Sequence, residues 1–336
     1  MADTFFCLDI GESLIKITDA KKNGNEIDID TIGYIATDSK FYSADNEKNI
    51  TDEAAIITKL VASLKITKKN VSVVIPDAFT YSRILLMPFL NEKELISAIK
   101  YQADQFIPMP IDETNIDIEI LQEFSTEKKL LVLMVASPKK LIDKIQSLTE
   151  MAGLLPQSVE NELSASARFV TENAKPLGIA AGGAFIIVNI GWRSTSLYYF
   201  DPTLLLLTQT HNFKIGYELF IKEIMINTGG DHTKAIETLN VFDEQNTIIA
   251  PILNEFSTEL KRFITLINEK NHTQVKTAYL INEAFRFASL ASYLTTSLSI
   301  PAKALNPYGI CRKSNSVESH KNELSLFVPA IGGNFR

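Results

Sequence analysis

Two similar short segments, one in each half of the chain, most constrain how this sequence can fold. Residues 8–13, Leu-Asp-Ile-Gly-Glu-Ser, end an apolar run in a polar residue and then turn at a glycine toward a hydroxyl. Residues 188–195, Val-Asn-Ile-Gly-Trp-Arg-Ser-Thr, repeat that order. A glycine turn between two strands can present backbone N–H groups and hydroxyls to a phosphate. The repetition predicts an α/β chain built from two similar halves.

The hydrophobic pattern predicts alternating strands and helices. Short apolar runs predict strands at 5–10, 14–18, 27–36, 71–75, 81–87, 115–123, 129–136, 185–190, 195–200, 203–210 and 277–281. Helical spacing predicts helices at 52–66, 92–106, 138–152, 158–171, 216–228, 247–268 and 283–297. Thr51 or Asp52 is expected to cap the first helix, and Asn91 with Glu94 forms a capping box on the second. Residues 313–323 are expected to be a loop.

Composition and charge exclude several classes of protein. The 336 residues include 33 basic and 40 acidic side chains, a net charge of −7, and a nucleic-acid binder would show a basic patch instead. The two cysteines, Cys7 and Cys311, fit a reducing cytoplasm. The first residues lack the positive charge of a signal peptide, and no apolar run approaches the roughly 18 residues of a membrane span. We expect a cytoplasmic chain whose membrane contact is indirect.

Common catalytic motifs are missing. The sequence has no P-loop, no G-x-G-x-x-G and no G-x-S-x-G motif. Its four histidines lie too far apart in sequence for the spacing of a zinc site. We assign no catalytic residue, and enzymatic activity is not predicted.

Several stretches resemble the PilM family of type IV pilus assembly, which is related to the cell-division protein FtsA. The most distinctive is 91–110, which begins Asn-Glu-Lys-Glu-Leu and ends Gln-Phe-Ile-Pro-Met-Pro. Further similar stretches lie in the same order at 74–76, Arg83, 86–88, 136–139, 152–154 and 327–332. The two glycine turns resemble the two phosphate hairpins of actin-like ATPases.

The resemblance implies a fold and its subdivision. The fold is actin-like, a duplicated ribonuclease H-like α/β fold with an inserted strand-helix-strand-strand subdomain. Residues 1–39 and 153–184 would form the first actin-like subdomain, and 40–152 the inserted, partner-binding subdomain. Residues 185–336 would form the second half, with a small helical subdomain around 230–272.

The resemblance also implies a nucleotide site between the halves, with Asp9 beside a Mg²⁺ ion. The residues expected there are Asp9, Gly11, Glu12, Ser13, Lys16, Asn189, Gly191, Arg193, Ser194, Thr195, Gly216 and Asn282.

Three departures from the ATPase pattern predict that this site is degenerate. Asn189 replaces an aspartate, which removes a negative charge near the metal. Arg193 could either contact a phosphate or fill the site with its own cation. The adenosine loop, residues 281–285, has no glycine. The whole chain has only 14 glycines in 336 residues, a share below the usual one of about 7%. Binding of ATP with Mg²⁺ stays an open alternative.

The leading functional hypothesis is a cytoplasmic scaffold of the pilus assembly platform. By resemblance, it would bind the N-terminal cytoplasmic peptide of a PilN-like membrane protein and couple it to the pilus motor ATPases. Candidate peptide contacts are Phe106, Pro108 and Pro110, although packing within the insertion explains them equally well. The alternative is an active actin-like ATPase whose nucleotide state controls assembly or self-association. A membrane-tethered filament, a small-molecule kinase and a type II secretion protein are less well supported.

Overall fold

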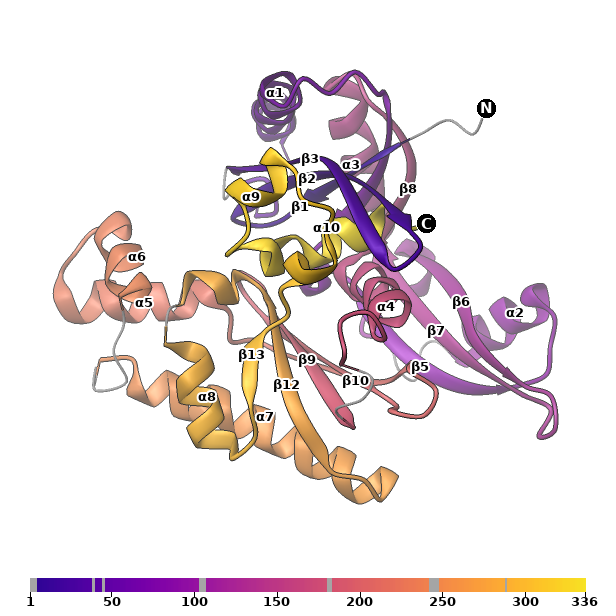
Figure 1. Cartoon of the computed structure of the whole chain (residues 1–336). Helices are drawn as coiled ribbons and strands as arrows, with labels where there is room; N and C mark the ends of the chain where they lie inside the picture. The colour runs from indigo at the N-terminus through magenta and orange to yellow at the C-terminus, as the bar shows by residue number, and fades with distance from the viewer. Residues whose placement is uncertain are drawn as a thin grey trace.

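Three β-sheets and the helices around them make up the molecule. The computed structural model describes residues 5–37, 40–43, 46–102, 107–179, 183–241, 248–287 and 289–336. The first sheet has the order β3-β2-β1-β4-β8, and the second has the order β11-β10-β9-β12-β13. The third sheet, β5-β7-β6, lies with α2 on one side of the molecule, and α5 and α6 lie on the opposite side (Figure 1).

The strands of the first two sheets follow the same plan in both halves. The first sheet contains β1 (Phe6–Ile10), β2 (Leu14–Asn23), β3 (Glu26–Ala36), β4 (Asn70–Ile75) and β8 (Leu155–Asn161). The second contains β9 (Ala184–Ile190), β10 (Thr195–Phe200), β11 (Leu207–Phe213), β12 (Val275–Asn282) and β13 (Ala302–Ala304). In each, an antiparallel meander is followed by a parallel strand beside its first member, β4 next to β1 and β12 next to β9. Strands β1 and β9 are buried along their whole length, as central strands of a sheet covered on both faces should be.

The third sheet is the inserted unit. Its strands are β5 (Tyr81–Pro88), β6 (Thr114–Phe124) and β7 (Lys129–Pro138). Alternate residues of β7 and the apolar side of α2 enclose a small core of their own. With α2 between β5 and β6, the unit has the expected strand-helix-strand-strand order.

The helices cover the sheets. They are α1 (Glu47–Ser63), α2 (Glu92–Gln102), α3 (Lys139–Met151), α4 (Glu162–Asn173), α5 (Tyr217–Thr228), α6 (His232–Asn240), α7 (Ala250–Asn271), α8 (Leu290–Leu298), α9 (Asn315–Ser319) and α10 (Val328–Gly333). Short 3₁₀ turns include η1 (Asp77–Phe79), η3 (Ile111–Glu113), η5 (Glu283–Arg286), η6 (Pro307–Ile310) and η7 (Leu324–Phe327). In the part of the chain that the structure describes, no helix has the length and hydrophobicity needed to cross a bilayer.

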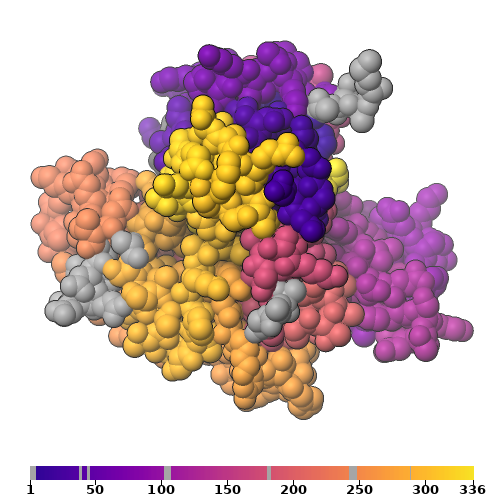
Figure 2. All heavy atoms as spheres, in the orientation of Figure 1, coloured from indigo at the N-terminus to yellow at the C-terminus, as the bar shows by residue number. Residues whose placement is uncertain are grey.

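The inserted unit is smaller than the predicted 40–152. Strand β4 pairs with β1 and β8 inside the first sheet, and α1 and α3 pack on that sheet. The chain therefore leaves the first half only between 81 and 138. Figure 2 shows this unit as a lobe opposite the lobe of α5 and α6.

The division at 185–336 predicts that the last residues pack with the second half, but they pack with the first. Helix α10 packs against α4 and the first sheet, where the two glycines at its end allow close approach. A Cβ on Gly332 would lie 2.0 Å from the carbonyl oxygen of Ala165. Asn334 then donates a hydrogen bond of 2.7 Å to Thr18 Oγ1 on β2.

Four local predictions are corrected by the structure. Helix α1 begins at Glu47 because Asn46, not Thr51 or Asp52, caps it, accepting from the backbone N–H of Asn49 at 2.8 Å. The predicted helix at 158–171 begins at Glu162, since the residues before it form β8. The predicted helix at 283–297 is the turn η5 followed by α8, and the predicted loop at 313–323 contains α9. The capping box of α2 is confirmed by reciprocal hydrogen bonds between Asn91 and Glu94.

Candidate functional site

The two glycine turns meet at the carboxyl ends of the central strands of both large sheets. Each closes in the same way: Gly11 N–H donates to Leu14 O at 3.0 Å, and Gly191 N–H donates to Ser194 O at 2.9 Å. A Cβ on Gly11 would lie 2.6 Å from that Leu14 oxygen, so the first turn requires glycine. Ligands of open α/β sheets bind at this edge.

A buried ion pair lies behind the first turn. Asp9 on β1 and Lys16 on β2 are cross-strand partners, which puts their side chains on one face of the sheet. Lys16 Nζ is 2.8 Å from Asp9 Oδ2 and donates a second contact of 2.8 Å to Asn282 Oδ1 at the end of β12. All three side chains are buried. Lys16 therefore joins the first half to the second through contacts that are shielded from solvent.

Amide and acid side chains extend this network. Glu162, the first residue of α4, accepts from Asn282 Nδ2 at 2.7 Å and from Asn189 Nδ2 at 2.9 Å. Asn189 Nδ2 also donates to the hydroxyl of Tyr198 at 2.8 Å, and that hydroxyl donates to Asp77 in η1. In these bonds the carboxyl groups belong to the first half and the side-chain donors belong to the second.

This buried cluster contains more carboxyl groups than cations. Desolvation by burial, with the charge of Asp77 nearby, raises the pKa of Glu162 to about 8. Burial also raises the pKa of Asp9 and of Asp77. For Lys16, burial alone would lower the pKa, but Asp9 and Glu162 together raise it. Near neutral pH the cluster therefore keeps Lys16 charged, and the raised pKa values favour protonation among its carboxyl groups.

A second set of contacts crosses in front of the turns. The Ser13 hydroxyl donates to Glu283 in η5, and the other oxygen of Glu283 pairs with Arg286 at 3.1 Å. Glu12 receives Arg193 from the second turn, with Nε at 3.3 Å and the backbone N–H at 3.3 Å. Burial raises the pKa of Glu12 to about 7 even though Arg193 opposes the shift. Both turns are thus bound by acidic and basic side chains of the protein itself.

The remaining predicted residues hold the second turn against the start of α5. Thr195 Oγ1 donates to Ile215 O at 2.7 Å, and Ser194 Oγ accepts from Asn212 at 3.3 Å. Gly216 lies at the N-cap of α5, where a Cβ would be 2.4 Å from the carbonyl oxygen of Trp192. These hydroxyls are engaged with their own half of the protein.

The backbone of Asn282 keeps a conformation that normally requires glycine. Its φ is +64° and its ψ is −131°. Such a conformation costs a residue with a Cβ roughly 1–3 kcal/mol. Hydrogen bonds to Lys16 and Glu162 hold the side chain in place. The adenosine loop thus has a glycine-like shape without a glycine.

The residues present do not fit Mg-ATP in this arrangement. Phosphate groups need N–H and cationic donors. Two donors at the turns, the Ser13 hydroxyl and Arg193, already bind Glu283 and Glu12, so a phosphate there would meet two carboxylates. Among the described residues, no three or more His, Cys, Asp or Glu side chains are grouped to hold a metal ion. The place of Asp9 beside Mg²⁺ stays a prediction.

Sequence reasoning missed four residues of the site: Glu283, Glu162, Asp77 and Tyr198. Glu162 directly follows the parallel strand β8, and Asp77 lies two residues after the parallel strand β4; polar residues at such positions are a usable signal. Since β8 was predicted to be helical, the signal at Glu162 was hidden.

A groove beside the inserted unit contains two of the three predicted peptide contacts. Tyr42 and Phe79, whose rings stack 4.3 Å apart, line it together with Met109 and Leu141. Its volume is about 480 Å³, and Pro108 lines it. A smaller hollow of about 330 Å³ continues from Met109 and is lined by Pro110. We call these two hollows the insertion groove; Phe106 lies outside the described residues.

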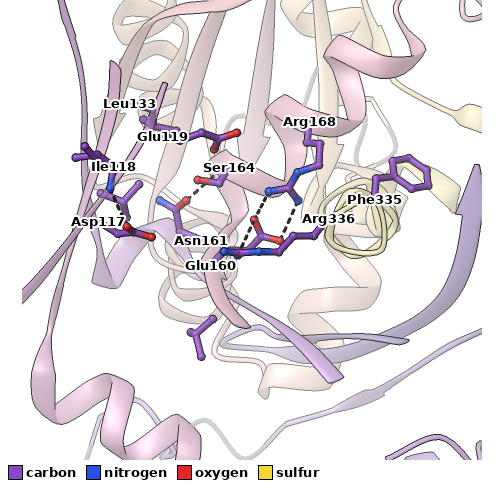
Figure 3. A pocket seen from close by; sticks show the side chains of 12 residues that line it. Asp117, Ile118, Glu119, Leu133, Glu160, Asn161, Ser164, Arg168, Phe335 and Arg336 are labelled. Carbon is purple, nitrogen blue, oxygen red and sulfur yellow. Dashed lines mark hydrogen bonds and ion pairs between the residues drawn. The ribbon is translucent and has the colours of Figure 1, made fainter. Parts of the chain in front are cut away.

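A second hollow, of about 340 Å³, lies between β6, β8 and α4. Figure 3 shows Arg168 pointing to Glu160, with contacts of 2.7 and 3.0 Å, and Arg336 beside them. Asp117 and Glu119 line the facing wall on β6. Charged side chains line both this hollow and the insertion groove, Lys140 among them in the groove, but the insertion groove has the larger apolar surface.

Comparison with known proteins decides the family. The model of the family described as type IV pilus assembly protein PilM matches residues 7–334. The chain belongs to the PilM family. Its role is therefore in type IV pilus assembly, as the sequence motifs predict.

Solved structures agree on the fold. A PilM–PilN type IV pilus biogenesis complex matches with a TM-score of 0.85 and 20% identity, over 98% of this chain and 97% of that one. The ethanolamine utilization protein EutJ from Carboxydothermus hydrogenoformans matches at 0.53 and 10%, over 98% and 88%. A Bacteroides thetaiotaomicron protein of actin-like ATPase fold matches at 0.50 and 7%, over 98% and 95%. The actin-like α/β fold is confirmed.

Proposed function

We propose that this PilM-family chain is a scaffold at the cytoplasmic face of the inner membrane. It binds the N-terminal cytoplasmic peptide of a PilN-like membrane protein and couples that protein to the pilus motor ATPases. The supporting observation is the family match over residues 7–334, together with the likeness in fold to a PilM that was solved with PilN. Membrane contact is then made through the partner.

The insertion groove is the proposed peptide site. Its walls offer aromatic and aliphatic surface from Phe79, Met109 and Leu141, and an apolar peptide side chain gains roughly 1.5–3 kcal/mol on full burial there. The charged hollow of Figure 3 has an Arg168–Glu160 ion pair at its floor and offers less apolar surface. An extended tail can therefore anchor through apolar side chains between the first sheet and the inserted unit.

The test is fluorescence anisotropy with a labelled peptide copied from the tail of the PilN-like protein of the same organism. Leu141→Lys and Met109→Lys place a charge in the groove and should weaken binding by about tenfold or more. Ser147→Lys, exposed on the same helix as Leu141, is the matched control and should bind like the wild type. Glu119→Lys puts the same charge in the hollow of Figure 3.

Loss of binding in Glu119→Lys alone would move the peptide to that hollow. If no tail peptide binds the wild type, the partner proposal fails. The motor partners and self-association are addressed by pull-down and sedimentation of the full chain.

We further propose that the nucleotide site is degenerate. Support comes from Glu283 and Glu12, which bind two donors that a triphosphate would otherwise contact, the Ser13 hydroxyl and Arg193. Isothermal titration with Mg-ATP should show no binding. Tight binding that disappears in Asp9→Ala would instead support the alternative, an actin-like ATPase.

A further inference from the structure

Side chains of the two halves contact each other directly between the glycine turns. Each contact joins a residue of the first half to one of the second. The pairs are Ser13 with Glu283, Glu12 with Arg193, Lys16 with Asn282, Glu162 with Asn189 and Asn282, and Asp77 with Tyr198.

Glu283 supplies an anion to the first turn. It is only 4% exposed, and its two oxygens contact the Ser13 hydroxyl and Arg286. A carboxylate offers the negative charge and acceptor oxygens that a phosphate would offer to the same hydroxyl. The position directly after β12 carries this side chain from the second half onto the first.

Arg193 supplies a cation to the opposite side. It extends from the second turn to Glu12 in the first turn, where its side chain and backbone N–H contact both carboxylate oxygens. Glu12 is 6% exposed and would be costly to bury without this partner. The contact therefore stabilises only the arrangement in which the turns are close together.

We propose that Glu283 and Arg193 are built-in ligands that clasp the two halves in one closed arrangement without nucleotide. Glu283 takes the place of a bound anion at Ser13, and Arg193 neutralises Glu12. This inference rests on the proposed degenerate site and adds what occupies it and what that occupant does. In this protein the relative position of the halves is set by the sequence and not by ATP.

The test measures the distance between the halves by pulsed electron paramagnetic resonance. Spin labels go on cysteines at the exposed Lys59 of α1 and Lys234 of α6, since Cys7 and Cys311 are buried. The labelled wild-type chain should give one narrow distance distribution, unchanged by Mg-ATP. Glu283→Ala should broaden it toward longer distances, and the exposed control Glu255→Ala should not.

Inorganic phosphate provides an independent readout. It should raise the melting temperature of Glu283→Ala, in which the anion place at Ser13 is vacated, and leave that of the wild type unchanged. Should Glu283→Ala fail to fold, Ser13→Ala combined with Glu12→Gln removes the hydrogen bond to Glu283 and the charge that Arg193 pairs with, at little change in volume, and broadening there supports the clasp.

An unchanged distribution in the folded variant, or a wild-type distribution that shifts with Mg-ATP, overturns the inference. Titration with Mg-ATP separates the two failures. If the distance distribution contradicts the clasp but the wild type binds no nucleotide, only the clasp is wrong and the degenerate site remains supported. Tight nucleotide binding would contradict both proposals. Peptide binding in the insertion groove is measured separately.

Discussion

Asn282 combines a strained backbone with a fully used side chain. Its amide accepts from Lys16 and donates to Glu162 and Asn189, while its φ of +64° would suit glycine better. The strain costs roughly 1–3 kcal/mol, and each buried partner left without a hydrogen bond costs a similar amount. Because more than one buried partner depends on Asn282, its hydrogen bonds contribute more free energy than the backbone strain costs.

We predict a stability order of wild type, then Asn282→Gly, then Asn282→Ala. Glycine relieves the strain but leaves Lys16 and Glu162 short of a partner, for a net loss of about 1–3 kcal/mol. Alanine loses the same hydrogen bonds and keeps the strain, which lowers its stability by about 1 kcal/mol more. Urea denaturation of the three proteins gives the order. A glycine variant more stable than the wild type would show that strain dominates.

Glu162 should make stability depend on pH. Its pKa is raised from 4.5 to about 8 in the folded protein, so the folded state binds more protons than the unfolded state between these values. Its stabilising contribution is complete below the unfolded pKa and is lost as pH rises through the folded one. Stability should fall between about pH 5 and pH 8, and Glu162→Gln should flatten this fall. Parallel urea titrations across that range check both curves, and equal slopes would contradict the prediction.

At the scale of elements, the meanders and α2 could be predicted because their signals are local. Strands β1 to β3 have apolar runs separated by short polar or glycine turns, and Asn91 with Glu94 marks the start of α2. Strand β8 could not be predicted, because Leu155–Asn161 is an edge strand with few apolar residues. Asp77 and Glu162 were hidden as site residues because only the assembled sheet brings the ends of β4 and β8 together.

Helix α10 depends on the absence of a side chain where it crosses α4. The added methyl group of Gly332→Ala would overlap the backbone of Ala165, and the helix would have to move off its neighbour. We expect a loss of about 1–3 kcal/mol or more by chemical denaturation. Gly309→Ala is the matched control, because nothing lies within 4 Å of its added Cβ, and it should change stability by less than about 0.5 kcal/mol. Equal effects of the two substitutions would show that α10 adjusts freely.

At the scale of the whole molecule, one core spans both halves. Residues of β3, α4 and η7 pack with Phe185 of β9 and Tyr279 of β12 in a single cluster. Sequence periodicity shows which residues face a core, but it does not show which residues of the two halves pack together. The boundary of the inserted unit was misplaced for the same reason, since the pairing of β4 with β1 spans the whole of α1.

A shared core predicts that the two halves unfold together. Trp192 is the single tryptophan and lies in the second half, so its fluorescence reports that half, while far-ultraviolet circular dichroism reports the whole chain. The two probes should give coincident urea transitions. A fluorescence midpoint well below that of circular dichroism would show that the second half opens independently.

The return of α10 to the first sheet also affects the order of events during synthesis. Cys7 on β1 lies against Gly333, so α10 covers a strand that is synthesised well before it. Nascent chains that stop short of residues 328–333 leave that strand uncovered however long they wait. The first half can therefore bury β1 completely only after the second half has been translated.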